Sequence, residues 1–64
     1  MPLIRVEMFE GRSTDQKREL VEALTRETAR VCKCSPESVI ILIQDVKKSD
    51  WGVGGQLCSE KYPE

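Results

Sequence analysis

The sequence predicts an α/β fold in which a strand, a helix and a second strand follow one another and a short glycine-rich hairpin comes last. Residues 3–9 alternate as a strand does, residues 13–32 repeat apolar side chains at helical spacing, and residues 39–43 form a run rich in β-branched side chains. A strand–helix–strand unit has a right-handed crossover and two parallel strands. The 64 residues leave room for one domain, residues 1–64.

The first predicted strand has an apolar face and a mixed face. The apolar face carries Ile4, Val6 and Met8. The mixed face carries Leu3, Arg5, Glu7 and Phe9. Gly11 follows and ends the strand with a turn.

The helix is predicted to begin at Ser13, whose hydroxyl can cap the first turn. Gln16 completes a capping box with it, and Asp15 adds negative charge at the positive end of the helix dipole. The helix is expected to end near Cys32, because the residue before Pro36 disfavours helical backbone. Its apolar stripe is made of Leu20, Val21, Leu24, Thr28 and Val31.

The second strand is predicted at residues 39–43, and its continuous apolar run indicates cover on both faces. Residues 45–50 are polar and turn-like. Residues 51–55 hold too many glycines for a strand interior, so they are expected to form a short hairpin or arm that leans on another surface. The tail, residues 60–64, is expected to fray.

The chain is too small to cover these surfaces by itself. A domain of this size buries only about 60% of the surface that its unfolded chain exposes. One helix covers one face of two strands, which leaves the opposite face, the strand edges and Trp51 without cover. The sequence therefore predicts an obligate oligomer whose sheet continues or packs between subunits.

Cysteine and charge patterns exclude several other classes. Cys32, Cys34 and Cys58 are odd in number and lack C-x-x-C spacing, and there is no histidine, so disulfides and metal are not expected. The cysteines are interpreted as small, partly buried apolar residues. A net charge of −1 gives no excess of basic residues of the kind that binds nucleic acid. Without a membrane-spanning run or a signal peptide, the expected location is the cytoplasm.

Four features of the chain together resemble the 4-oxalocrotonate tautomerase family over nearly its whole length. They are Pro2, residues 10–13 (Glu-Gly-Arg-Ser), residues 15–17 (Asp-Gln-Lys) and the aromatic-Gly-x-Gly-Gly-x-Leu run at residues 51–57. The resemblance implies a β-α-β subunit, dimers with a four-stranded sheet, and usually a hexamer built as a trimer of dimers. It also implies an isomerase that needs no cofactor and no metal.

The resemblance assigns the proton transfer to Pro2, because the initial methionine is normally removed in this family. An ordinary N-terminal amine has a pKa of about 7.7–8.0. Burial in an apolar site near cations disfavours the charged amine and lowers that pKa, which favours a neutral base. The implied reaction moves a proton between the enol and keto forms of a 2-hydroxy-dienoic or 2-oxo acid, such as 2-hydroxymuconate.

The same resemblance assigns substrate binding to Arg12 and Trp51. Arg12 directly precedes the predicted helix N-terminus, where anions are favoured, and its guanidinium suits a carboxylate through paired hydrogen bonds. Trp51 takes the place of the family's active-site aromatic, where it would stack on a planar substrate and keep the pocket dry.

Ile40 departs from the family pattern, since well-known members carry there a second arginine that stabilises enolate charge. Three interpretations stay open. Another cation replaces it, with Arg5 as the first candidate and Arg30 as the second. The substrate is a monocarboxylate, such as an aryl pyruvate enol. Or the chain is a half-catalytic or structural subunit of a hetero-oligomer, and its partner supplies the arginine. A small-acid binding module without turnover is a further alternative.

Overall fold

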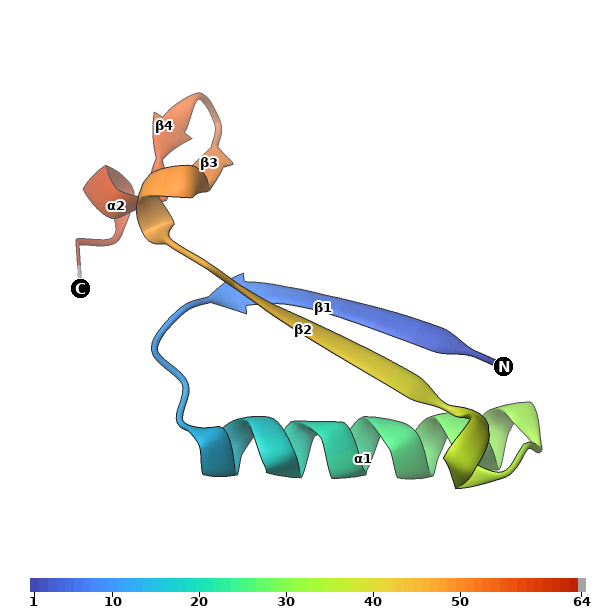
Figure 1. Cartoon of the computed structure of the whole chain (residues 1–64). Helices are drawn as coiled ribbons and strands as arrows, with labels where there is room; N and C mark the ends of the chain where they lie inside the picture. The colour runs from blue at the N-terminus through green and yellow to red at the C-terminus, as the bar shows by residue number, and fades with distance from the viewer. Residues whose placement is uncertain (64) are drawn as a thin grey trace.

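The computed structural model describes residues 1–63 and confirms the β-α-β order with a C-terminal hairpin (Figure 1). In chain order the elements are β1 (Leu3–Phe9), α1 (Thr14–Cys32), a 3-10 turn (Pro36–Ser38), β2 (Ile40–Val46), a second 3-10 turn (Lys48–Asp50), β3 (Gly52–Val53), β4 (Gln56–Leu57) and α2 (Cys58–Lys61). The strands of the hairpin pair antiparallel, as expected for the glycine-rich segment.

The strands β1 and β2 pair in parallel over the seven residues of each. The N–H of Ile40 donates to the Pro2 carbonyl over 2.9 Å, and the N–H of Glu10 donates to the Val46 carbonyl over 3.0 Å. Neighbouring residues of a strand point their backbone N–H and C=O groups to opposite sides. The even-numbered residues of β1 therefore form the hydrogen bonds to β2. The odd-numbered residues turn their N–H and C=O groups toward the free edge of β1.

The helix α1 covers one face of this sheet (Figure 1). Ile4 and Met8 share grooves with α1 and are half-buried, which confirms the apolar face predicted for the first strand. On the opposite face, Leu3 is 52% exposed, Leu42 44% and Ile40 37%. Within the subunit, β2 is therefore covered on one face only, whereas its apolar run predicted cover on both.

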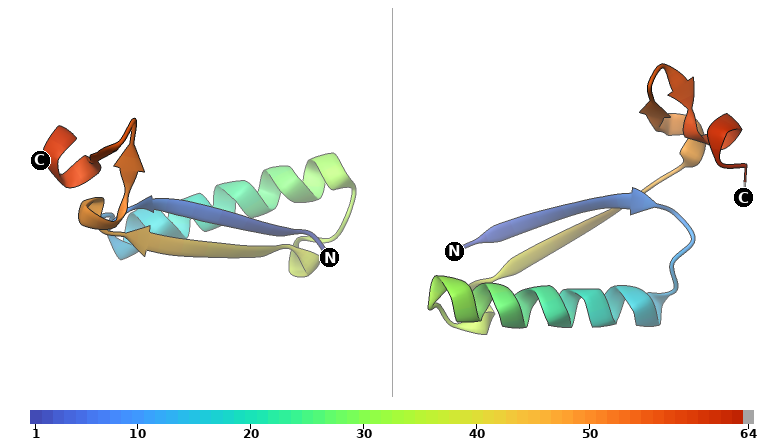
Figure 2. Two further views of the ribbon diagram at one scale, coloured as in Figure 1. Left: turned by 90° about the horizontal axis from the view of Figure 1, so that it is seen from above. Right: turned by 180° about the vertical axis from the view of Figure 1, so that it is seen from behind.

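The subunit has almost no interior, and Cys58 alone is classed as buried among residues 1–63. Val31, which was predicted to lie in the covered stripe of α1, is 66% exposed, and Cys32 is exposed as well. The reason is visible from above: α1 crosses the strands at an angle, and its C-terminal half projects past β1 on the side away from β2 (Figure 2, left). The last turns of α1 therefore have no strand of this chain above them.

The helix begins where the capping box predicts. The Ser13 hydroxyl accepts a hydrogen bond from the N–H of Gln16 over 3.1 Å, and the Gln16 side chain accepts one from the Ser13 N–H over 2.9 Å. At the other end, Lys33 adopts left-handed backbone with φ of 55°, and its N–H donates to the Ala29 carbonyl. These bonds satisfy backbone groups that a helix end otherwise leaves without partners.

Ser13→Ala is expected to lower the free energy of unfolding by about 1 kcal/mol, because the cap of α1 loses its acceptor. Thermal unfolding followed by circular dichroism, at one fixed protein concentration, measures the loss. Ser49→Ala removes an exposed hydroxyl outside α1 and serves as the matched control. Equal melting temperatures for the two variants would contradict the role of the cap.

The second strand runs on to Val46, past the end predicted at residue 43. Asp45, which was assigned to a polar turn, lies in this strand, because the backbone pairing with β1 continues through Met8–Asp45 to Phe9–Val46. Its carboxylate also forms an ion pair with Lys17 of α1 at 2.5 Å. The expectation of a frayed tail is also corrected for residues 60–62. The N–H of Cys58 donates to the Trp51 carbonyl over 2.7 Å and α2 follows, so the end of the chain is anchored beside the hairpin. Residue 64, the last of that predicted tail, lies outside the described residues.

Candidate active site

Arg12 lies in the turn between β1 and α1. Gly11 precedes it with φ of 120°, a backbone conformation that favours glycine and lets the chain reverse toward the helix. The Arg12 guanidinium donates through Nη1 to the Phe9 carbonyl over 3.1 Å. Because Phe9 is odd-numbered, this carbonyl belongs to the free edge of β1. Arg12 is therefore held at that edge.

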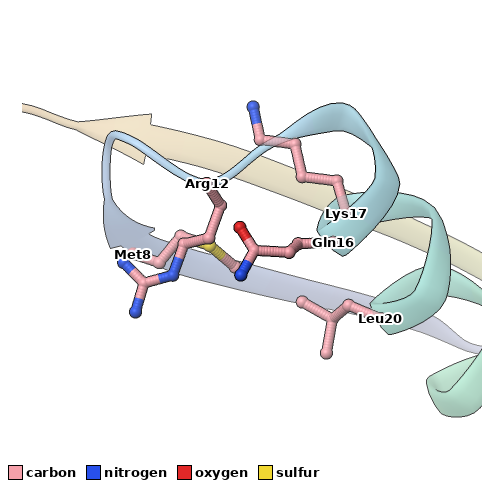
Figure 3. Close-up of a pocket in the computed structure, with 5 residues that line it drawn as sticks. All are labelled: Met8, Arg12, Gln16, Lys17 and Leu20. Carbon is pink, nitrogen blue, oxygen red and sulfur yellow. The ribbon is translucent and has the colours of Figure 1, made fainter.

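Two open grooves meet at Arg12. One, of about 390 Å³, is lined by Phe9, Glu10, Gly11, Arg12, Gln16 and Lys48. The other, of about 210 Å³, is lined by Met8, Arg12, Gln16, Lys17 and Leu20 (Figure 3). In the close-up, Arg12 and Gln16 extend side by side toward Met8, whereas the Lys17 side chain points away from them. The larger groove thus combines two cationic side chains with one carboxylate, which suits a small anion.

An aromatic pair adjoins the Arg12 groove. The rings of Phe9 and Trp51 meet edge to face, with 4.7 Å between centroids and 70° between planes. The Nζ atom of Lys48 lies 5.5 Å from the centre of the Phe9 ring and donates to the Tyr62 carbonyl over 2.9 Å. Phe9 thus connects Arg12 on one side with Trp51 and Lys48 on the other.

Sequence reasoning missed Phe9 and Lys48 as members of this cluster. Phe9 was recognised only as part of the mixed strand face, and Lys48 only as part of a polar turn. The signal for Phe9 was its position at the end of β1, just before the turn that carries Arg12. The position of Lys48 depends on the second 3-10 turn, for which the sequence held no comparable signal.

Pro2 lies at the opposite end of β1, in surroundings of a different kind. It lines an open groove of about 410 Å³ with Ile4, Glu27, Thr28, Val31 and Cys32. Glu27, the one charged residue in this lining, is paired with Arg30 at 2.7 Å. The hydrogen bond from Ile40 fixes the carbonyl of Pro2. The groove at Pro2 is therefore largely apolar.

One subunit does not bring the predicted site residues together. The seven-residue strand β1 separates Pro2 from the Arg12 groove by about 20–25 Å at the usual rise of a strand. Arg12 and Trp51 do share one end of the sheet, through Phe9. Arg5 lies midway along β1 and lines none of the three grooves described above. Ile40 adjoins Pro2 at the start of the two strands.

In the described part of the chain, residues 1–63, no cluster of three or more cysteine or carboxylate side chains is placed to hold a metal ion. None of the helices in that part is long and apolar enough to cross a membrane. The cationic side chains that line the larger groove are those of Arg12 and Lys48.

Comparison with known proteins places the chain among enzymes. A family model described as tautomerase enzyme matches residues 2–61. A probable tautomerase of Halalkalibacterium halodurans is 36% identical over 61 residues, which are 95% of this chain and 100% of that protein. The 2-hydroxymuconate tautomerase of Bacillus subtilis is 35% identical over 60 residues, 94% of this chain and 97% of its own length.

Solved structures agree with the sequence matches. A chain of a heterohexamer 4-oxalocrotonate tautomerase from Chloroflexus aurantiacus J-10-fl is 42% identical, with a TM-score of 0.89 over 94% of this chain and 97% of that one. A 4-oxalocrotonate tautomerase homologue of the tomaymycin biosynthetic pathway, TomN, is 33% identical, with a TM-score of 0.93 over 98% and 97% of the two chains.

The fold and these matches define an isomerase that carries out tautomerisation. The chain belongs to the tautomerase family, within the 4-oxalocrotonate tautomerase group, as the residues quoted from its sequence predicted.

Proposed function

We propose that this isomerase moves a proton between the enol and keto forms of a 2-hydroxy-dienoic or 2-oxo acid, with Pro2 as the base and the acid. The observation that carries this proposal is the cationic groove at Arg12, which adjoins an aromatic pair and suits a small planar acid. The similarity to the 2-hydroxymuconate tautomerase of Bacillus subtilis supports this substrate class.

The proposed step needs Pro2 as the N-terminus, because the nitrogen of Pro2 is otherwise a tertiary amide without basicity. Met1 is 85% exposed, so it is open to removal. The free Pro2 nitrogen then takes the proton of the enol hydroxyl, and the oxygen becomes the carbonyl. The electron pair of the double bond receives the same proton at carbon. Substrate and product are isomers, so no oxidant, reductant or leaving group is involved.

Arg12 is proposed to hold the substrate carboxylate. Its guanidinium offers paired hydrogen bonds, and the N-terminus of α1 directly behind it favours negative charge. Lys48 adds a second cation to the same groove. Trp51 is proposed to form the apolar wall beside the substrate, held in place by its edge-to-face contact with Phe9.

The active enzyme is proposed to be a homo-oligomer, a hexamer, in the cytoplasm. Pro2 and Arg12 lie at opposite ends of β1, so one substrate reaches both only if they come from different copies. The exposed Leu3, Leu42, Val53 and Leu57 give such copies apolar surface to bury.

A second candidate function is that of a half-catalytic or structural subunit in a mixed assembly. Two observations favour it. The chain is 42% identical to a chain of a heterohexamer 4-oxalocrotonate tautomerase, and it carries Ile40 where the family pattern has a cation. In the proposed mixed assembly, a different chain supplies the positive charge that Ile40 does not.

Kinetics of the purified chain alone separate the two candidates. Mass spectrometry first confirms that Met1 is absent, and absorbance then follows the ketonisation of 2-hydroxymuconate and of an aryl pyruvate enol. Turnover of either substrate by the chain alone is the expected result. If a processed, folded oligomer of this chain turns over neither substrate, the proposal of a homo-oligomeric enzyme is overturned and the proposal of a mixed assembly remains.

The surroundings of Pro2 predict a preference for substrates with one carboxylate. Ile40 and the apolar groove at Pro2 offer no cation to a second carboxylate. We therefore expect a higher kcat/KM for the aryl pyruvate enol than for 2-hydroxymuconate. Ile40→Arg is expected to move this ratio toward the dicarboxylate by about 10–100-fold, the value of one hydrogen bond to a charged group.

Gln44→Arg is the matched control for that prediction, because it adds the same charge at an exposed polar position on the same strand face but farther from Pro2. It is expected to leave the ratio of the two kcat/KM values unchanged. A preference for the dicarboxylate in the unaltered chain would contradict the prediction.

A further inference from the structure

Lys48 is the second cation of the Arg12 groove, and its side chain is held close to the protein. It begins the 3-10 turn that follows β2, and it is half-buried, whereas its neighbour Lys47 is exposed. Its Nζ atom lies 5.5 Å from the centre of the Phe9 ring. A cation over an aromatic face at this distance is attracted by the ring. The ammonium group therefore stays at the groove and does not extend into solvent.

Phe9 holds both cations of this groove. Its backbone carbonyl accepts a hydrogen bond from Arg12 Nη1 over 3.1 Å, and its ring faces Lys48. Among the described residues that line the groove, these two positive charges outnumber one negative charge, that of the exposed Glu10. Arg12 comes from the turn before α1 and Lys48 from the turn after β2, so an anion in the groove can bond to both.

The C-terminal segment fixes the direction of the Lys48 side chain. Its Nζ atom donates to the Tyr62 carbonyl over 2.9 Å. The N–H of Tyr62 donates to the Cys58 carbonyl over 2.8 Å and closes α2, which lies beside the turn that carries Lys48 (Figure 1). An ammonium group has three N–H donors, so it can donate to this carbonyl and to a substrate oxygen at the same time.

The other cations near the grooves are placed less well for this task. Lys17 is in an ion pair with the carboxylate of Asp45 and points away from Arg12 (Figure 3). Arg30 is in an ion pair within α1, outside the Arg12 groove. Arg5 lines none of the three grooves. These placements leave the lysine of the 3-10 turn as the partner of Arg12.

We propose that Lys48, positioned by the Tyr62 carbonyl, binds the substrate carboxylate together with Arg12. The identity of that substrate rests on the proposed function, but the binding itself requires no turnover. Arg12 supplies paired hydrogen bonds of fixed geometry, and Lys48 supplies a compact charge. Because the carboxylate keeps its charge during the proton transfer, Lys48 is expected to act on KM more than on kcat.

Binding of cinnamate, a planar acid with no enol proton to move, tests this assignment without turnover. Lys48→Met keeps the apolar contact with Phe9 but removes the charge, and it is expected to raise the dissociation constant for cinnamate about tenfold by titration calorimetry. Lys48→Arg keeps the charge and is expected to retain most of the affinity. Lys47→Met removes the neighbouring exposed charge, so it is the matched control and is expected to bind as the unaltered chain does.

A pair of variants at Tyr62 tests the positioning of Lys48. Tyr62→Pro removes the N–H that closes α2 and disfavours helical backbone at the preceding residue, so it displaces the carbonyl. Tyr62→Ala loses the same aromatic ring but keeps the N–H. Tyr62→Pro is expected to weaken cinnamate binding as Lys48→Met does, and Tyr62→Ala is expected to retain the affinity. In a Lys48→Met background, Tyr62→Pro is expected to cause no further loss, because it acts through Lys48.

Unchanged affinity in Lys48→Met, an equal loss in Lys47→Met, or no binding of cinnamate by the unaltered chain would overturn the carboxylate assignment. Equal affinities of Tyr62→Pro and Tyr62→Ala, or additive losses in the double variant, would overturn the positioning by Tyr62. Sedimentation must show the same assembly for each variant, and Lys48→Gln takes the place of Lys48→Met if it does not. A chain that binds cinnamate through Lys48 but turns over no enol would overturn the proposed function and not this assignment.

Discussion

Replacing Pro2 by alanine is expected to lower kcat/KM for enol ketonisation by about 10²–10⁴-fold, the usual contribution of a positioned general base. An N-terminal alanine keeps an amine, but it loses the ring that fixes the direction of the nitrogen. The groove at Pro2 offers no other base, because its one carboxylate, Glu27, is paired with Arg30. Progress curves with an aryl pyruvate enol measure the effect.

The control for this variant is its assembly and processing. Mass spectrometry must show that Met1 is removed from both proteins, and sedimentation must show the same oligomer. If Pro2→Ala then works within tenfold of the unaltered enzyme, another group transfers the proton. A chain extended at the N-terminus so that Met1 is retained is expected to be as inactive as Pro2→Ala.

Arg12→Ala is expected to lower kcat/KM by about 30–1000-fold, because the substrate carboxylate loses its paired, charge-assisted hydrogen bonds. Most of the loss is expected in KM, with a smaller loss in kcat from poorer positioning. Arg12→Lys keeps the charge but not the paired geometry, so it is expected to recover only part of the activity. Steady-state kinetics of the three proteins measure this order.

Arg12 also donates to the Phe9 carbonyl, so loss of activity by itself would not separate binding from structure. The melting temperature and the sedimentation of Arg12→Ala provide that separation. A stable, assembled Arg12→Ala enzyme with an unchanged KM would contradict the role of Arg12 in holding the carboxylate.

Local patterns predicted most of the fold. The capping box at Ser13 predicted the start of α1, and the proline after the helix predicted its end. The alternation of residues 3–9 identifies the face of β1 that meets the helix. The predictions failed where a contact distant in sequence decides the outcome. Asp45 continues β2 because β1 pairs with it as far as Val46, and α2 is anchored because the N–H of Cys58 donates to the Trp51 carbonyl.

The site was predictable only as separate parts. The sequence marks Pro2, Arg12 and Trp51, and the structure joins Arg12 to Trp51 through the Phe9 ring. Lys48 joins this cluster through a turn that propensity does not identify. The 20–25 Å that separates Pro2 from Arg12 follows from strand geometry. That distance is the physical reason why one copy cannot form the proposed site.

The small size of the chain has a related consequence. A subunit in which only Cys58 is classed as buried leaves apolar side chains on the outer sheet face, on the hairpin and at the end of α1. Burial of these surfaces between copies contributes about 25 cal/mol for each Å² of apolar area, which the isolated subunit lacks. The proposed assembly therefore stabilises the fold at the same surfaces that complete the proposed site.

Subunit complementation tests the shared site most directly. Pro2→Ala and Arg12→Ala chains are each assayed alone, then mixed in equal amounts, dissociated and reassembled. Because each site takes Pro2 from one copy and Arg12 from another, about a quarter of the sites in a random mixture are intact, and about a quarter of the unaltered activity is expected to return. Activity that stays at the level of the separate variants in a reassembled mixture would contradict a site shared between copies.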